Sequence, residues 1–534
     1  MSSQLGERTA LARGAALDGV VLAALWCLAA VVVGPPPDFP LNDAWSYGVA
    51  VQRLVEEGRY APTGWTATTL VTHVLWGALF CLPGGFSFAA LKVASLAAGL
   101  IGAWGTYALV RGVAGRRELA LLSAAVVAFN PVYFALANTF MTDVSYAAAS
   151  TASAACLARG LRGGGRRWSA AGLALAVVAL LGRHIGLVPL AAYGLALWVR
   201  RGAPARRLAA AATASGLGVA GLAGLAVWLG SAPRMLAQAF ATPLYLGLFL
   251  LPVLAAVRVA RAPRLADAGA LVFALAGGAG IVAAGWRMPF LATVSEGNVI
   301  VAAGIGPLTL RDAFFLDSAG WAPLGPVFWA AATALALLGG ALLVRTALTL
   351  SGELYARARS GPWDGADSAA LFLLVASAFY CLPTAFLPGA FDRYLLPVLP
   401  LACGALAARA EGPTLRAPRL AAALAPAVCL LLFAVAGTRD YLAWNRARWD
   451  ELHELVGERG VALSRIDGGF EFNGLHLYSR DYERAPERSW WWVEDDEYVL
   501  AFAPIDGYAV ERRVAVRRWL PPCEDELLVL RRRD

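Results

Sequence analysis

Long apolar runs separated by short polar loops occupy the first 437 residues of the chain. A helix that crosses a bilayer needs about 20 predominantly apolar residues, and most of these runs approach that length. The pattern therefore predicts an all-α polytopic membrane domain over residues 1–437, with about thirteen transmembrane helices. We expect these spans near residues 15–34, 88–110, 119–134, 144–158, 168–181, 186–199, 208–230, 243–257, 268–286, 323–344, 369–386, 397–408 and 420–436.

The loop between the first two predicted spans covers residues 35–87 and has a pattern of its own. Residues 44–60 carry apolar side chains on one helical face and charges on the other, which predicts a surface helix lying in the membrane interface. Residues 68–82 are apolar but short, so we interpret them as a re-entrant or partial span.

The last part of the chain, residues 438–534, differs in composition from the rest. It is charged and aromatic, and residues 498–502 and 527–530 form short alternating runs that are typical of strands. We predict a small α/β domain here, on the extracytoplasmic side.

The composition supports a membrane protein over a soluble one. Hydrophobic residues make up 59% of the chain and charged residues only 15%, more apolar sequence than a water-soluble core requires. The net charge of +8 does not indicate nucleic-acid binding, because the basic residues cluster in short loops between apolar runs. The seven cysteines have no metal-ligand spacing and are interpreted as small apolar side chains. We interpret the first run as an uncleaved anchor.

The charges of the loops predict the orientation in the membrane. Arginine clusters follow alternate spans, near residues 111–117, 159–167, 200–207 and 258–264, whereas the intervening loops are poor in basic residues. Positively charged loops lie on the cytoplasmic side. We therefore expect a multi-pass protein of a bacterial inner membrane, with a cytoplasmic N-terminus and the first long loop and C-terminal domain outside.

The ionisable residues of the outer side form a small set. Such groups are costly in a bilayer and usually line a cavity or a pathway. The set contains Asp38, Asp43, His73, Asp143, Arg183, His184, Glu296, Arg311, Asp312, Asp392 and Arg393.

Asp43 and Asp143 stand out because each precedes or begins a predicted helix. The simpler interpretation of both is a helix N-cap, because Asp accepts backbone N–H bonds there. A rigidly held carboxylate is also suited to act as a catalytic base. Both interpretations stay open for both residues.

Two further segments suggest contacts to an anion. Arg183 and His184 interrupt two predicted spans, and Asp392 and Arg393 precede another. The planar guanidinium of arginine suits phosphate oxygens, and a histidine can donate a hydrogen bond beside it. The alternatives are a polar turn at residues 183–184 and a local ion pair at residues 392–393.

Two aromatic features are weaker signals. His73 lies in an apolar stretch, where a histidine is more often structural than functional. The run Trp490, Trp491 and Trp492 could stack on a sugar, but membrane anchoring or packing of the C-terminal domain is the more common use of such residues.

These short motifs occur in a recognisable order: an acid in the first outer loop, a second Asp after the third span, a polar break after the fifth, and Arg-Tyr-Leu-Leu-Pro before a late span. In this order they resemble the lipid-dependent glycosyltransferases of the C-type fold. The resemblance is to bacterial members of glycosyltransferase family 39, which include protein O-mannosyltransferases and lipid A aminoarabinose transferases, and it covers roughly residues 43–401.

The resemblance implies a reaction and roles for several residues. Such enzymes transfer a sugar from a polyprenyl-phosphate donor to a glycan, lipid or protein acceptor of the cell envelope. Asp43 matches the catalytic base, and Asp143 matches a second acid that helps to bind the acceptor or a divalent cation. By position, Arg183, His184 and Arg393 would face the donor phosphate. The expected substrate-binding residues are these three together with His73 and Asp392. Many relatives have two adjacent acids in the first loop, whereas this chain has Asn42 before Asp43.

The chemistry of the residues agrees with such a transfer. Arginine can offset the charge of a phosphate leaving group, and Asp43 can accept the proton of an acceptor hydroxyl. A single displacement with one base would invert the anomeric carbon. The alternatives are a transporter or flippase, which would favour internal repeats and charges at mid-span, and a non-catalytic membrane scaffold.

Overall fold

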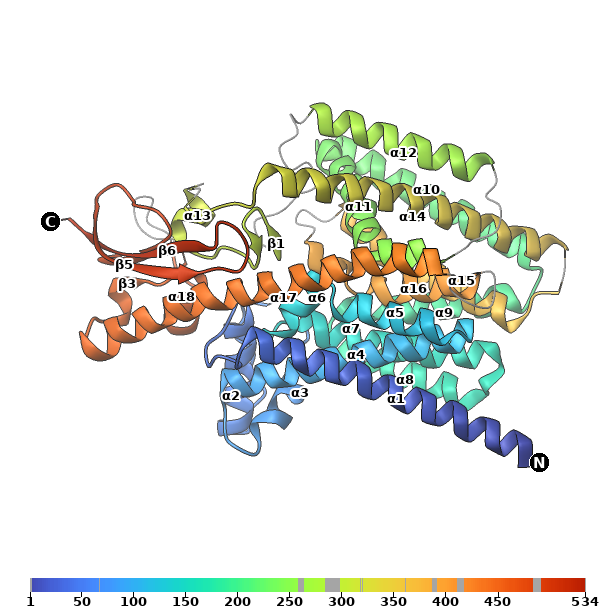
Figure 1. The fold of residues 1–534 in the computed structure, drawn as a ribbon, viewed down its shortest axis with the longest axis horizontal. Helices are drawn as coiled ribbons and strands as arrows, with labels where there is room; N and C mark the ends of the chain where they lie inside the picture. Colours follow the sequence, from blue (N-terminus) through green and yellow to red (C-terminus); the bar gives the residue numbers. More distant parts are fainter. Residues whose placement is uncertain are drawn as a thin grey trace.

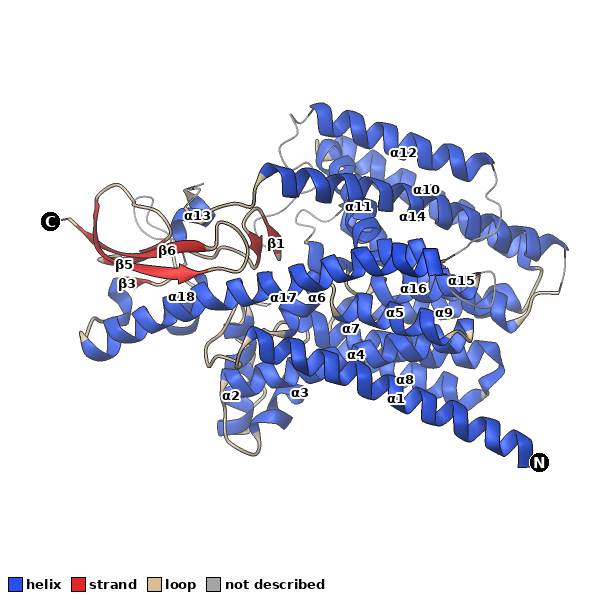
Figure 2. Cartoon of the chain, viewed as in Figure 1, coloured by secondary structure: helices blue, strands red, loops and turns tan. Residues whose placement is uncertain are grey.

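The computed structural model describes residues 2–66, 68–257, 264–283, 298–316, 318, 320–360, 362–386, 391–410, 417–483 and 491–533. Helices make up most of it, and a small sheet stands at one end of the helical bundle (Figures 1 and 2). The helices are, in chain order, α1 (Ser2–Val33), α2 (Ala44–Glu57), α3 (Val71–Cys81), α4 (Phe88–Ala114), α5 (Arg117–Ala128), α6 (Pro131–Ala137), α7 (Thr142–Arg159), α8 (Arg166–Gly182), α9 (Leu187–Arg200), α10 (Pro204–Trp228), α11 (Ala232–Ala256), α12 (Arg264–Ala283), α13 (Arg311–Phe315), α14 (Pro326–Ser360), α15 (Gly365–Phe386), α16 (Val398–Ala408), α17 (Ala417–His453) and α18 (Phe470–Leu477).

Every predicted span overlaps one of these helices, but the count of thirteen is not confirmed. Among the described residues, six helices are long and apolar enough to cross a membrane: α1, α4, α11, α14, α15 and α17. A seventh span results if α5 and α6, which meet at a bend of 62°, are taken together. Apolar periodicity finds helices, but it does not show where one bends or stops short: α3 and α16 have only 11 residues each.

The predicted surface helix is present as α2. It ends at Gly58, whose φ of 66° lets its N–H donate to the carbonyl of Arg53. Only glycine reaches this left-handed conformation without a steric penalty, so the residue explains where the helix stops. The residues of α2 nearest Asp43, from Ala44 to Gly48, are buried, and the later turns are more exposed.

The C-terminal part forms a four-stranded sheet in the order β3-β4-β6-β5, and the sequence predicted strands in this region. Its strands are β3 (Ile466–Asp467), β4 (Tyr498–Ala501), β5 (Tyr508–Arg517) and β6 (Glu524–Arg532). The two strand-like runs of the sequence lie in β4 and β6. Strand β3 pairs parallel with β4, and the other pairs are antiparallel. Helix α17 runs without a break across residue 438, so the change in composition falls within a helix.

The elements that surround Asp43 lie at one end of the bundle. Figure 1 shows α2, α18 and the C-terminal sheet at that end, and the N-terminus at the other. A short hairpin, β1 (Ile300–Val301) and β2 (Gly304–Ile305), and two single turns, η2 (His184–Gly186) and η3 (Asp392–Leu395), complete the described structure around the site. Residues 258–263, which carry part of the fourth arginine cluster, lie outside the described residues.

Candidate active site

The carboxylate of Asp43 is directed away from the helix that it precedes. Asp43 occupies the N-cap position of α2, but its side chain makes no capping hydrogen bond. Oδ1 instead accepts a hydrogen bond of 2.9 Å from Nε1 of Trp65, and Oδ2 lies 3.9 Å from Nη2 of Arg393. The interpretation of Asp43 as a side-chain cap is therefore wrong, and its carboxylate faces an arginine.

Asn42 holds the backbone that presents this carboxylate. Its φ of 54° lies in the left-handed region, which Asn tolerates better than most residues do. Its side-chain Oδ1 accepts a hydrogen bond of 2.9 Å from the backbone N–H of Asp43. Its own N–H donates to Oε1 of Glu471 at 2.8 Å. These two bonds fix the peptide that leads into Asp43.

Arg393 is a buried cation with unused hydrogen-bonding capacity. The residue is 9% exposed, and its Nε and Nη1 have no hydrogen-bond partner among the described residues. The guanidinium lies over the ring of Phe391, 4.4 Å from the centroid. Buried polar groups almost always have partners, and a charged group without one is expensive. Such an arginine is suited to an anion that arrives as a ligand.

Asp392 does not pair with Arg393. Its side chain instead links the turn that carries Arg393 to the hairpin at residues 299 and 300. Its carboxylate accepts hydrogen bonds from the backbone N–H groups of Val299, at 3.1 Å, and Ile300, at 2.8 Å. Burial raises the pKa of Asp392 to about 6, although these amides oppose the rise. The structure thus gives Asp392 a supporting contact, and the local ion pair considered from the sequence does not form.

A second acid and a second arginine lie beside the first pair. Asp143, in the first turn of α7, is 2% exposed and forms an ion pair with Arg183. Arg183 leaves the end of α8 in an extended conformation and lies over two rings, Tyr146 at 5.8 Å and Tyr394 at 5.6 Å. Arg393 lies 5.9 Å from the same Tyr394 ring. One tyrosine therefore contacts both guanidinium groups.

The electrostatics of Tyr47 show that the four charged residues converge. Burial raises the pKa of this phenol on α2, the charges of Asp43 and Asp143 raise it further, and those of Arg393 and Arg183 lower it. The pKa of Asp43 itself is raised by burial, while Arg393 and the hydrogen bond from Trp65 lower it. The sequence-based expectation that these acids and arginines come together is consistent with this geometry.

Two predicted histidines do not join these contacts. His184, the residue after Arg183, is exposed. His73 is buried on α3, where Nδ1 is 2.8 Å from the hydroxyl of Ser145 and Nε2 is 3.3 Å from the carbonyl of Phe140. With both nitrogens occupied by protein groups, His73 links α3 to α7. Its role in substrate binding stays a prediction.

The remaining outer-side residues take structural positions. Asp38 accepts a hydrogen bond from the N–H of Ala89, and Arg311 pairs with Asp496. Asp312 accepts from the backbone N–H groups of residues 502 and 503, next to the sheet. Glu296 and Trp490 lie outside the described residues, whereas Trp492 packs against Trp45 and Phe470.

Sequence reasoning missed Trp65, Tyr47, Tyr394 and Glu471 as parts of this region. Only Tyr394 had a usable signal, since it lies inside the Arg-Tyr-Leu-Leu-Pro motif. Trp65 and Glu471 belong to segments that carry no periodic pattern, and they reach Asp43 and Asn42 only through the tertiary fold.

An apolar groove leads away from the Asp143–Arg183 pair. A cavity of about 250 Å³ begins at Thr142 and Gly182 and lies between α3, α4, α7 and α8. A second cavity of about 690 Å³ shares Ile101 and Ala152 with the first and continues along α4 and α7 to Arg159. Together they form a path with apolar walls along the length of these helices.

The acids of the site do not match a divalent-cation site. Within the part of the chain that the structure describes, no three His, Cys, Asp or Glu side chains come together as ligands. Asp143 is paired with Arg183, and Asp43 faces Arg393. A cation at either acid would have to compete with a guanidinium, so we derive no step through a metal.

No protein-family model matches the chain, and no curated protein matches its sequence. The structural neighbours are two crystal structures of ArnT from Cupriavidus metallidurans. The form bound to undecaprenyl phosphate has a TM-score of 0.45 and 14% identity, over 96% of this chain and 97% of that one. The apo form has a TM-score of 0.35 and 18% identity, over 85% and 83%. ArnT is a lipid A aminoarabinose transferase of the C-type fold, the class that the motifs of this sequence resemble.

Proposed function

We propose that this protein transfers a sugar from a polyprenyl-phosphate donor to a hydroxyl group of an envelope glycan, lipid or protein. The observation that carries the proposal is Arg393, a buried guanidinium whose Nε and Nη1 have no hydrogen-bond partner among the described residues. It lies next to the carboxylate of Asp43, which makes no capping hydrogen bond. A phosphate oxygen of the donor would accept hydrogen bonds from Arg393, and an acceptor hydroxyl would donate to the carboxylate of Asp43. A base and an anion-binding group that face each other are the two requirements of a displacement at a sugar phosphate.

The reaction follows from the two groups. Asp43 accepts the proton of the acceptor hydroxyl as its oxygen bonds to the anomeric carbon. The bond from that carbon to the phosphate oxygen breaks at the same time, and the N–H groups of Arg393 donate to the phosphate on which negative charge develops. Because the acceptor attacks opposite the leaving phosphate, the configuration at the anomeric carbon inverts.

The apolar groove suits the lipid part of the donor. Its lining includes Thr142 and Gly182, the chain neighbours of Asp143 and Arg183 of the polar site. A polyprenyl chain could lie along α4 and α7 while its phosphate stays at the arginines. We place this site on the extracytoplasmic side of an inner membrane, because the arginine clusters follow the opposite ends of the spans.

The test compares the cell envelopes of a deletion strain that is complemented with the wild-type gene or with an Asp43→Asn variant. Mass spectrometry of glycans, lipids and proteins should show a sugar-sized mass that is lost on deletion. The wild-type gene should restore it and the variant should not, at equal membrane levels of both proteins. Restoration by Asp43→Asn would remove Asp43 from the reaction. An unchanged envelope in the deletion strain would contradict sugar transfer altogether.

A further inference from the structure

The C-terminal region reaches the candidate site through one buried acid. Glu471, in the first turn of α18, has no exposed surface. Its Oε1 accepts the N–H of Asn42 at 2.8 Å, and its Oε2 accepts from the hydroxyl of Thr309 at 2.7 Å and from Nη1 of Arg448 at 2.8 Å. Four segments that are distant in the sequence therefore meet at this carboxylate.

Arg448, the cation of this network, is as deeply buried as Glu471. It lies on α17, with its guanidinium 5.1 Å from the ring of Trp444 and 5.7 Å from that of Trp449. A buried ion pair gives little net stability compared with an apolar pair of the same size. Packing of α18 on the bundle therefore does not by itself account for a charged pair at this place.

The position of the contact suggests what the pair is for. Glu471 accepts a hydrogen bond from the backbone N–H of Asn42, the residue directly before Asp43, whose φ lies in the left-handed region. The other side of the same loop is held by Lys92 of α4, the only lysine of the chain. Its Nζ donates to the carbonyls of Pro37, at 2.9 Å, and Phe39, at 2.6 Å. The approach to Asp43 is thus fixed from the membrane helices and from the C-terminal region.

We propose that Glu471 is a positioning residue, which fixes the Asn42–Asp43 peptide and thereby aims the Asp43 carboxylate at the space beside Arg393. The inference rests on the proposed function of Asp43 as a base. It assigns a task to the C-terminal region, since α18 would have to be docked for the base to be in place. Glu471 would act through Asn42 and would not touch the substrate.

The charge of Glu471 provides a way to observe this coupling. The charged and titratable groups around Asp43 are Arg393 of η3, Asp143 of α7, Tyr47 of α2 and Glu471 of α18. Burial is the main cause of the raised pKa of Asp43, and the negative charge of Glu471 adds to it. Removal of that charge should therefore lower the pKa of Asp43.

The first measurement follows Asp43 without any sugar donor. The full-length protein in lipid nanodiscs is treated with N,N′-dicyclohexylcarbodiimide, which modifies protonated buried carboxyl groups, and the adduct at Asp43 is quantified by peptide mass spectrometry across pH. The midpoint of labelling should move to lower pH in Glu471→Gln. An unchanged midpoint in a folded variant would overturn the coupling.

Asp525→Asn is the matched control for this measurement. Asp525 forms a similarly buried pair with Arg518, which ties the sheet to the carbonyls of Ala303 and Ala322, away from Asn42. This variant should lower the thermal midpoint without moving the labelling midpoint of Asp43. An equal shift of the labelling midpoint in Asp525→Asn would show that any loosening of the C-terminal region has the same effect. That result would contradict a specific role of Glu471.

A second variant covers the case in which Glu471→Gln does not fold, because that change leaves Arg448 unpaired. Glu471→Asp keeps the charge but shortens the side chain, so it should keep Arg448 paired and lose the bond to Asn42. Hydrogen exchange in the peptide that carries Asn42 and Asp43 should be at least tenfold faster than in the wild type. Transfer should fall, while the Kd for undecaprenyl phosphate stays the same. Unchanged exchange would contradict the proposal. The exchange rate, unlike transfer, does not depend on whether Asp43 proves to be the base.

Discussion

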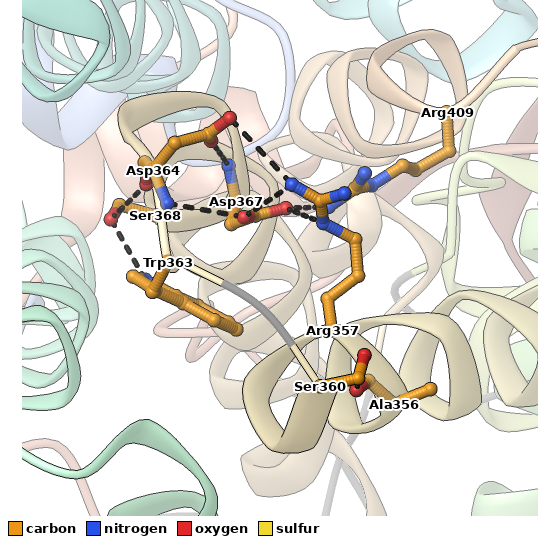
Figure 3. A network of polar contacts seen from close by, with 8 residues as sticks. All are labelled: Ala356, Arg357, Ser360, Trp363, Asp364, Asp367, Ser368 and Arg409. Atoms are coloured by element: carbon orange, nitrogen blue, oxygen red, sulfur yellow. Dashed lines mark hydrogen bonds and ion pairs between the residues drawn. The ribbon is translucent and has the colours of Figure 1, made fainter.

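Arginines from other elements lie near the two ends of α15, and their hydrogen bonding differs. At its first turn, the buried carboxylate of Asp367 accepts hydrogen bonds from Nε of Arg357, at 3.0 Å, and from Nη2 of Arg409 (Figure 3). The buried Nε of Arg409 has no partner among the described residues, but its guanidinium is bound directly to a carboxylate. Beyond the other end of α15, the acid that pairs with Arg393 within the described part of the chain is Asp43, 3.9 Å away.

This difference separates a structural arginine from a binding one. The Asp367 cluster ties the end of α14, the start of α15 and the residue after α16 together, and its charges are matched within the protein. Within the residues that the structure describes, no carboxylate lies at hydrogen-bonding distance from Arg393. A folded protein tolerates such a group where the missing partner is a ligand, because the ligand then receives the full strength of a buried, charged donor.

The largest effect is expected for the base at the Arg393 end. Asp43→Asn keeps the size of the side chain and the contact with Trp65 but cannot accept a proton. Transfer should fall by about 10²- to 10⁴-fold, the usual contribution of a general base. Binding of undecaprenyl phosphate, measured by native mass spectrometry in nanodiscs, should persist. A matching loss of lipid binding would mean that the variant disturbs the site as a whole.

Replacement of one arginine at each end tests the contrast directly. Arg393→Gln should weaken the binding of undecaprenyl phosphate about 10- to 100-fold, which corresponds to about 1.5–3 kcal/mol for a hydrogen bond to a charged group. Its thermal midpoint should stay close to that of the wild type. Arg409→Gln should show the reverse, a lower thermal midpoint with unchanged lipid binding. If both variants lose only stability, Arg393 is a structural residue too.

Helix positions could be predicted from the sequence because apolar periodicity is a local property. The predicted surface helix and both strand-like runs overlap α2, β4 and β6 for this reason. The number of membrane-crossing helices could not be predicted from the sequence, because the bend between α5 and α6 depends on packing and on Pro131. The candidate site shows the same division. Asp43 and Arg393 were visible as charges at the ends of apolar runs, whereas Glu471 comes close only through the folding of α18 onto the first loop.

A smaller effect is expected for Trp65, which contacts Oδ1 of Asp43, whereas Arg393 faces Oδ2. Trp65→Phe keeps an aromatic ring but removes the N–H that donates to Oδ1 of Asp43. That bond lowers the pKa of Asp43, so its loss should raise the pKa, and the acid limb of the pH–rate profile should move to higher pH. This shift is opposite in sign to the one expected for Glu471→Gln. Transfer at neutral pH should fall only a few-fold, and a shift to lower pH would contradict the assignment of the titration to Asp43.

The smallest effect is expected for Asp392, which supports the turn of Arg393 without touching the site. Its folded-state pKa of about 6 lies above its ordinary value, so the folded protein binds a proton more tightly than the unfolded chain does. The stability from this group is therefore greatest at low pH and is lost as the pH rises through about 6. Asp392→Asn should remove that dependence, because an amide does not titrate and can still accept one of the two backbone N–H bonds. Thermal midpoints of both proteins between pH 4 and pH 7, about the range of this titration, should coincide at the acidic end, separate as the pH rises to about 6, and keep a constant difference above it. Parallel curves would show that Asp392 stays ionised throughout, and that the backbone amides of Val299 and Ile300 outweigh its burial.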